Sequence, residues 1–246
     1  MKKHNSNDFF WQSYVDVMTN LFAITLVLFV VSFFLFKGKN QELEQANADL
    51  RVMKEEYQRV KDMNNALQSL DNNEYFRYDP IFQKHILTLP FEYIRDRYEI
   101  PKGLIDPTVA SEISEVGKSI IKTICELKDK YITDQSADIP FNIKFLVVLE
   151  GQASRSGEEE HNDVLSYKRA LYLKKFWLDA DNMVQYKGIS FDSPELRCEM
   201  IVSGSGFSGS PREPDFIDGK VNTANQRFLV HIVPVIDWNN MNQKTN

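Results

Sequence analysis

The carboxyl group of Asp16 opens an apolar run that reaches Phe36, and residues 17–36 carry no charged side chain. This length matches the roughly 20 apolar residues that a membrane-spanning helix needs. On a helix, Thr19 and Asn20 share a face with Asp16, where they could hydrogen-bond it and shape a polar path. Acids inside membranes commonly mark ion or proton pathways. The pattern predicts that Asp16 carries an ion, supported by Thr19 and Asn20; the alternative is a solvated, inert helix-start acid.

The apolar run is longer than the 7–15 residues, roughly, of a signal peptide, and no small-residue cleavage site follows it. We therefore expect a retained transmembrane helix, residues 14–36, after a short cytoplasmic tail, residues 1–13. Lysines flank the run on both sides, so charge alone does not set its orientation.

The polar segment 37–72 has the features of a helical linker. Apolar or seam positions recur at alternating spacings of four and three, as in a heptad repeat. They are Ala46, Leu50, Met53, Tyr57, Val60, Asn64 and Leu67. The pattern predicts a dimerising coiled coil, with a single amphipathic helix lying on the downstream domain as the alternative.

Residues 73–240 are expected to form one domain, followed by a tail, 241–246. Short apolar runs predict strands at 85–89, 143–149, 196–202 and 228–236, with a polar loop over 207–223. Helical spacing predicts helices after Asp106-Pro107 and over 163–179. This order indicates an α/β two-layer sandwich, in which helices pack on one sheet.

Composition excludes some function classes. The net charge of −6 argues against nucleic acid as a direct partner, because phosphate binding needs a basic face. The four histidines and two cysteines are scattered, so we expect no metal site and no cofactor. No nucleophile–base spacing indicates an enzyme. Cys125 and Cys198 are either a disulfide or two buried thiols.

The residues around Asp16 read Phe10-Trp11-Gln12-Ser13-Tyr14-Val15-Asp16-Val17-Met18-Thr19. They resemble the start of MotB-type stator subunits of ion-driven motors. The form Trp-x-Ser-Tyr-x-Asp-x-Met-Thr is especially similar to the ZorB family, stator-like subunits of the Zorya anti-phage system. The resemblance implies that Asp16 carries H⁺ or Na⁺ and that a MotA- or ZorA-like polytopic membrane subunit surrounds a homodimer of this chain.

Four motifs in the downstream domain resemble those of OmpA-like peptidoglycan-binding domains, in the same order. They are Gly151-Gln152-Ala153-Ser154-x-x-Gly157, Asn162 with Leu165-Ser166-x-x-Arg169-Ala170, Gly204-x-Gly206 near Pro211, and Asn225-Gln226-Arg227. The resemblance implies an OmpA-like periplasmic domain that binds peptidoglycan. The implied binding residues are Arg169, Ser154, Asn162, Asn225 and Arg227.

The family recognises diaminopimelate in the peptide stem, which carries an amine and carboxylates. An arginine, here Arg169, takes a carboxylate in bidentate fashion, and an aspartate takes the ammonium. The aspartate position is Ser154 in this chain, and a neutral hydroxyl cannot form that ion pair. Residues 158–160 are glutamates, which either compensate or form a solvated acidic loop.

Together these resemblances predict an ion-driven, wall-anchored motor subunit of the bacterial inner membrane, with a cytoplasmic N-terminus and a periplasmic C-terminal domain. The motif around Asp16 and the short tail favour anti-phage defence. A flagellar stator subunit is the first alternative. The second is a passive OmpA-like tether from membrane to peptidoglycan, which leaves the face of Asp16 unexplained.

Overall fold

The computed structural model describes residues 6–131 and 143–236. The chain divides into two compact units, Met1–Gln58 and Arg59–Asn246. The predicted tail, 241–246, lies outside the described residues, as do the first five residues of the predicted cytoplasmic tail and the last four of the predicted domain.

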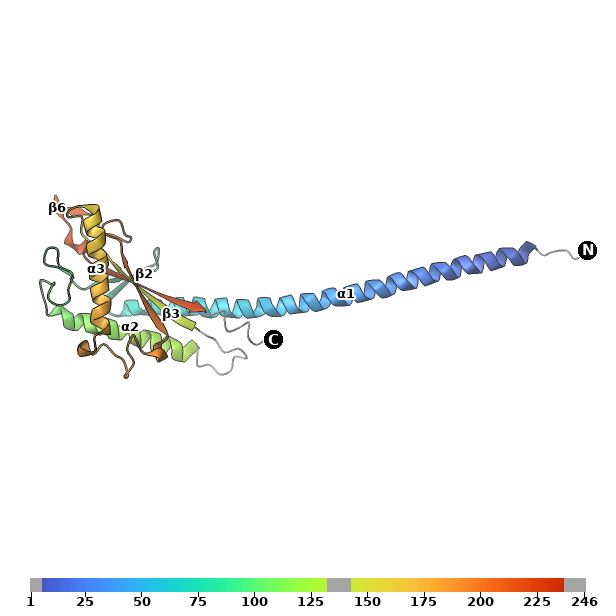
Figure 1. The fold of residues 1–246 in the computed structure, drawn as a ribbon, viewed down its shortest axis with the longest axis horizontal. Coiled ribbons are helices and arrows are strands. Elements are labelled where there is room, and N and C mark those ends of the chain that lie inside the picture. Colours follow the sequence, from blue (N-terminus) through green and yellow to red (C-terminus); the bar gives the residue numbers. More distant parts are fainter. Residues whose placement is uncertain (1–5, 132–142, 237–246) are drawn as a thin grey trace, which may run out of the picture. The chain divides into compact units, whose positions relative to one another are not determined.

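Helix α1, Ser6–Leu67, makes up the described part of the first unit and continues into the second (Figure 1). Its apolar portion is long and apolar enough to cross a membrane, and the side chains of residues 13–36 are exposed. The helix runs without a break from this portion into the predicted linker. One long apolar helix followed by a helical segment is therefore confirmed.

The two ends of the heptad pattern lie in different surroundings. Leu50, Met53 and Tyr57 are 62%, 55% and 70% exposed in the single chain. At the other end of the pattern, Leu67 is instead buried in the core of the second unit. Its neighbours Met63, outside the pattern, and Leu70, in the short 3-10 helix Gln68–Asn72 that follows, are buried there too. Because this unit begins at Arg59, the last part of the predicted linker belongs to the folded domain.

A five-stranded mixed sheet forms the centre of the second unit. Its strand order is β1-β2-β7-β3-β4, and every neighbouring pair is antiparallel except β3 and β4. The strands are β1 (Phe76–Asp79), β2 (Lys84–Leu87), β7 (Phe228–Ile236), β3 (Ile143–Gly151) and β4 (Cys198–Gly204).

Two helices cover the sheet, α2 (Val109–Tyr131) and α3 (Glu159–Leu178). Asp106 accepts hydrogen bonds from the backbone N–H and the hydroxyl of Thr108 just before α2, consistent with the predicted helix start. Helix α3 connects β3 to its parallel neighbour β4, because parallel strands need a long crossover. This crossover places the end of β3 beside the start of α3.

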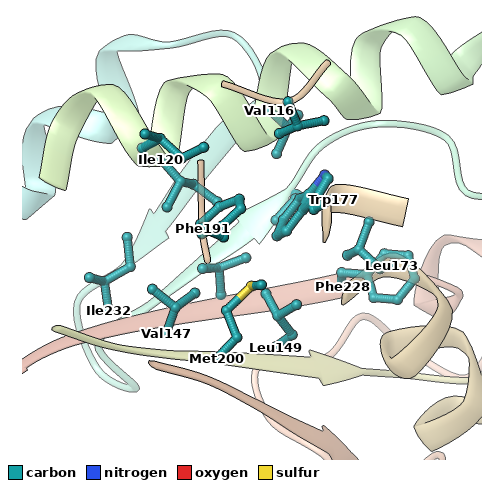
Figure 2. Packing of buried hydrophobic residues seen from close by; sticks show 14 of the residues in the cluster. Val116, Ile120, Val147, Leu149, Leu173, Trp177, Phe191, Met200, Phe228 and Ile232 are labelled. Carbon is teal, nitrogen blue, oxygen red and sulfur yellow. The ribbon is translucent and has the colours of Figure 1, made fainter. Parts of the chain in front are cut away.

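The core lies between the helices and one face of the sheet (Figure 2). Along β3, alternate residues from Ile143 to Gly151 are buried, as expected for a strand with one covered face. Trp177 of α3 is buried, and its indole N–H donates to the Ile113 carbonyl of α2 over 2.9 Å. The predicted two-layer α/β sandwich is confirmed.

The predicted loop over 207–223 contains a small hairpin. Strands β5 (Phe216–Ile217) and β6 (Lys220–Val221) pair in antiparallel fashion. The turn between them is Asp218-Gly219, and both residues have positive φ, 50° and 74°. Asp-Gly is a strong hairpin signal, so the sequence contained the evidence that this loop prediction overlooked.

Both cysteines are free thiols, which decides between the two possibilities left open by the sequence. Cys125 is buried in α2, and Cys198 is half-buried at the start of β4. Burial raises the pKa of the Cys198 thiol to about 12, so it is protonated at neutral pH.

Candidate functional site

A cavity of about 730 Å³ opens in the second unit, where three segments meet. The first is the loop around 93–96, which follows β2. The second is the loop 153–158, which follows β3, and the third is the first half of α3, up to Arg169. Gln226, just before β7, completes the wall. The crossover topology described above is what brings the second and third segments together.

Arg169 is a buried, positively charged residue in the lining of this cavity. The residue is only 4% exposed, and its Nε donates to the Arg97 carbonyl over 3.2 Å. Its guanidinium carbon lies 4.1 Å from the centroid of the Tyr93 ring. Among the hydrogen bonds of the described residues, none involves its two terminal nitrogens. Arg169 therefore presents unused donors to the cavity.

Burial lowers the pKa of Arg169 to about 10, because water no longer solvates the charge. The nearby carboxylate of Asp96 acts in the opposite direction and raises this pKa. The guanidinium still carries its charge at neutral pH. A buried cation with free donors is suited to an anion such as a carboxylate, which it can bind with two parallel hydrogen bonds.

Ser154 lines the same cavity, at the position where the resemblance places an aspartate. It is buried, and its hydroxyl accepts a hydrogen bond from the Gln226 side-chain amide over 3.1 Å. Its oxygen also lies 3.3 Å from the hydroxyl of Ser156. The hydroxyl is thus part of the wall and brings no charge to the site.

Asn162 lines the cavity, yet its amide group is engaged by the protein itself. Its Nδ2 donates to the carbonyls of Ser156 and Glu158, over 3.3 Å and 3.0 Å. These bonds hold the loop 154–158 against the start of α3. Arg169, Ser154 and Asn162 are therefore the three predicted binding residues that the structure brings together.

Asn225 and Arg227 do not line this cavity. Asn225 exchanges two hydrogen bonds of 3.0 Å with the backbone of Glu213. Arg227 is buried and donates to the Gln152 side chain over 3.0 Å and to the Pro211 carbonyl over 2.7 Å. Both residues fasten the segment 211–213 to the end of the sheet. Their direct role in ligand binding remains a prediction.

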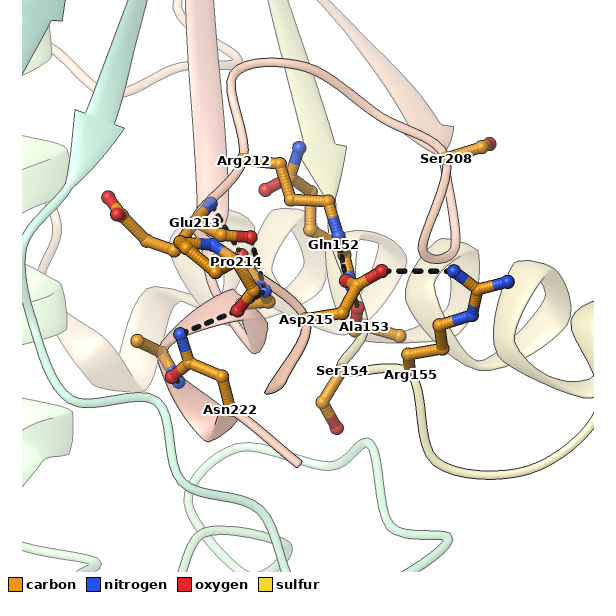
Figure 3. A network of polar contacts seen from close by, with 12 residues as sticks. Gln152, Ala153, Ser154, Arg155, Ser208, Arg212, Glu213, Pro214, Asp215 and Asn222 are labelled. Atoms are coloured by element: carbon orange, nitrogen blue, oxygen red, sulfur yellow. Dashed lines mark hydrogen bonds and ion pairs between the residues drawn. The ribbon is translucent and has the colours of Figure 1, made fainter. Parts of the chain in front are cut away.

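A polar network holds this segment beside the cavity wall (Figure 3). Arg212 donates to Asp215 over 2.6 Å and to the Ala153 carbonyl over 2.9 Å. Arg155 reaches the same carboxylate from the other side, over 3.2 Å. These two arginines keep the pKa of Asp215 below its usual range. The network fixes the backbone on which Ser154 sits.

The cavity lining includes residues that the sequence analysis did not assign to a binding site. Among them are Tyr93, Arg95, Asp96 and His161, together with Gln226, which appeared there only inside a motif. Asp96 lies in a turn with a positive φ of 60°, and its Oδ1 is 3.0 Å from the Nε2 of His161. A charged Arg-Asp-Arg triplet inside an aromatic-rich segment was the available signal for Asp96.

The predicted ion-path residues lie on α1, where helical geometry places them on a common face. Asp16, Thr19 and Asn20 are exposed in the single chain. The hydroxyl of Thr19 donates to the Val15 carbonyl over 2.8 Å, one turn earlier. Such back-bonding satisfies a hydroxyl within a helix and leaves its oxygen able to accept another bond.

No protein-family model matches the chain, and neither does any curated protein. Solved structures with some similarity include the periplasmic domain of Helicobacter pylori MotB, with a TM-score of 0.35 and 12% identity over 70% of this chain and 94% of that one. The OmpA-like domain of FopA1 from Francisella tularensis has a TM-score of 0.30 and 17% identity, over 66% of this chain and 80% of that one.

The peptidoglycan-associated lipoprotein from Burkholderia pseudomallei has a TM-score of 0.31 and 12% identity, over 58% of this chain and 88% of that one. These TM-scores are too low to support a conclusion.

Proposed function

We propose that this chain is a single-pass inner-membrane protein that binds peptidoglycan through the cavity at Arg169 and carries H⁺ or Na⁺ through Asp16. The observation that carries the proposal is the buried guanidinium of Arg169, whose free donors face a cavity. The chain that holds this cavity also has a helix long enough to cross a membrane, with an acid at the start of its apolar run.

Wall binding is supported by the chemistry of the cavity. Its volume of about 730 Å³ falls within the range of small-molecule sites, roughly 300–1,000 Å³. The peptide stems of peptidoglycan carry carboxylates, which are the natural partners of a desolvated arginine. Tyr93 lies beneath the guanidinium and supports it through its ring face.

Ion transport is supported by the residues of α1. Asp16, Thr19 and Asn20 are polar groups on one face of a helix whose following residues are apolar. In this proposal a MotA- or ZorA-like polytopic subunit surrounds two copies of the chain. The exposed side chains of Leu50, Met53 and Tyr57 provide a seam on which the two copies can pair.

The motif around Asp16 supports a role in anti-phage defence, with the N-terminus in the cytoplasm and the domain in the periplasm.

A substitution test separates the defence role from a flagellar stator subunit and from a passive tether. Asp16→Asn keeps the size and polarity of the side chain but cannot exchange a proton. Asp49→Asn is the matched control, since Asp49 is an exposed acid on the same helix outside the apolar run.

Both variants are expressed with the neighbouring genes and scored for phage protection, swimming, protein level and membrane location. We expect Asp16→Asn to abolish protection while Asp49→Asn retains it. Loss of swimming instead identifies a flagellar stator subunit. If neither activity changes in Asp16→Asn, the motor proposal is wrong and a passive tether explains the chain.

Wall binding is tested with purified sacculi and the full chain in detergent. Arg169→Gln removes the positive charge from the cavity lining. Arg77→Gln removes an exposed arginine of β1 that is paired with Glu213 and does not line the cavity. We expect Arg169→Gln to lose cosedimentation with sacculi and Arg77→Gln to retain it, with thermal unfolding confirming that both variants fold.

A further inference from the structure

The heptad pattern of the linker continues into the apolar portion of α1. Counted back from Tyr57, every seventh residue is large and apolar as far as the first turns of the apolar run. These residues are Leu50, Leu43, Phe36, Phe29 and Phe22. Because α1 runs unbroken through all of them, a constant spacing in the sequence is also a constant spacing on one helix. They occupy position a of a single repeat, and positions a and d together form its seam.

Position d of the same repeat carries smaller or more flexible side chains. Its members are Met18, Thr25, Ser32, Lys39, Ala46 and Met53. The hydroxyl oxygen of Thr25 lies 3.0 Å from the Leu21 carbonyl and 2.9 Å from the Phe22 carbonyl, so its donor is satisfied within the helix. Lys39 bonds Glu42 over 2.6 Å, just beyond the apolar run. Large residues at position a beside small ones at position d suit the knobs-into-holes packing of two helices.

The large side chains of the seam are open to the surroundings in the single chain. The six at position a, from Phe22 to Tyr57, are between 60% and 70% exposed. Lipid solvates every face of an apolar helix alike, so lipid alone does not favour a seven-residue spacing. On a straight helix such residues drift by about 20° per heptad, and winding around a partner helix keeps them on one line. The repeat therefore indicates a partner helix with a matching repeat.

We infer that two copies of this chain pair along one continuous seam from Phe22 to Tyr57, so that Phe22, Phe29 and Phe36 pack against the second copy inside the membrane. Both copies cross the membrane in the same direction, so the helices are parallel and equal positions of the repeat meet. This inference rests on the pairing in the proposed function and names the face of the membrane helix that makes it.

This pairing sets the direction of Asp16. In the repeat, Asp16 and Asn20 occupy the outer positions b and f, and at 3.5 residues per turn Asp16 points about 130° away from the seam. Each copy thus turns its carboxylate away from the other copy and towards the surrounding subunit. If the two carboxylates faced each other, their like charges would oppose ionisation of both. The pair therefore offers two separate ion sites.

Cysteine cross-linking tests the seam in the full chain, in inner-membrane vesicles from cells that also express the neighbouring genes. Thr25→Cys and Ser32→Cys place a thiol on the seam, whereas Ala23→Cys and Val30→Cys place one at the outer position b at a similar depth. Leu50→Cys reports pairing in the linker. With copper phenanthroline as the oxidant, we expect the seam variants to form disulfide-linked dimers at least about tenfold faster than the outer variants, because a disulfide needs closely spaced Cα atoms.

A second comparison removes one ring and keeps the thiol reporter. Phe29→Ala takes a large side chain from the seam, and Phe34→Ala takes the same ring from the outer position f. In the Ser32→Cys background, we expect Phe29→Ala to slow cross-linking about tenfold through weaker helix packing and Phe34→Ala to leave it unchanged. The unmodified chain, whose free thiols Cys125 and Cys198 lie outside α1, gives the background rate. Immunoblots of the membrane fraction check that each variant is inserted at the same level.

If Ala23→Cys or Val30→Cys cross-links as fast as the seam variants, the inference is overturned while pairing itself stands. The same conclusion follows if Phe34→Ala slows cross-linking as much as Phe29→Ala does, or if Leu50→Cys cross-links and no variant in the membrane portion does. If neither Leu50→Cys nor any membrane variant cross-links, the two copies do not pair, and this part of the proposed function fails together with the inference.

Discussion

The guanidinium of Arg169 lies 4.1 Å from the ring centroid of Tyr93, although 76 positions separate the two residues along the chain. The ring face compensates in part for the water that the buried charge has lost. Burial raises the pKa of the Tyr93 phenol, which therefore stays protonated and neutral at neutral pH. This pair holds the cation of the candidate site in place.

Replacing Tyr93 separates the contribution of its ring from that of its hydroxyl. The hydroxyl is buried and has no hydrogen-bond partner among the described residues, so Tyr93→Phe should leave the free energy of unfolding unchanged or raise it by up to about 1 kcal/mol. Tyr93→Leu loses the cation–π contact and should cost about 1–3 kcal/mol and weaken sacculus binding. Chemical denaturation of both variants measures the change in the free energy of unfolding. Equal losses of unfolding free energy in the two variants would contradict the role of the ring.

Gly151 ends β3 where α3 crosses it, and a methyl group at this position would overlap the backbone carbonyl of Ser166. The backbone cannot yield cheaply, so Gly151→Ala should destabilise the domain by roughly 1–3 kcal/mol. Gly38→Ala is the control, because nothing lies within 4 Å of its added methyl group. Thermal unfolding compares the two; an unchanged melting temperature in Gly151→Ala would refute the close approach.

Asn225 holds the backbone of Glu213 with a donor and an acceptor. Asn225→Ala leaves both backbone groups without these partners and should cost about 1–3 kcal/mol of unfolding free energy. Because Asn225 lies outside the cavity lining, the folded variant should bind sacculi as the unmodified chain does. Denaturation and cosedimentation are measured together. Lost binding with unchanged stability would instead indicate direct contact with the ligand.

His85 makes the stability of the domain depend on pH. Burial lowers its pKa in the folded state below the usual value, although its Nε2 lies 3.1 Å from the Leu67 carbonyl. The unfolded chain therefore takes up the proton first as the pH falls. Stability should be full above about pH 7 and decline as the pH falls below about 6.5.

The His85→Gln variant should have a shallower decline than the unmodified chain between about pH 7.5 and pH 5.5. His231→Gln is a useful comparison, because burial also lowers the pKa of that residue. Urea denaturation at several pH values gives the slopes. Identical slopes in His85→Gln and the unmodified chain would exclude His85 as a source of the pH dependence.

The sequence by itself determined the elements that have a strong periodic signal. The alternation along Ile143–Gly151 and the helical spacing after Asp106 report burial directly, because one face of each of these elements packs on the core. The apolar run after Asp16 instead reports, by its length, a helix that can cross a membrane. The crossover from a strand to a helix then places Ser154 and Arg169 in the same site. This part of the cavity could be anticipated from neighbouring motifs.

Only the tertiary structure decided which other residues complete the site. Asp96 and Tyr93 belong to a loop, where no periodicity reveals what a side chain faces, and they meet Arg169 through packing of distant segments. The same packing turns Asn225 and Arg227 away from the cavity and towards the segment 211–213. Local patterns specify elements, whereas the neighbours of a loop residue depend on how the whole chain packs.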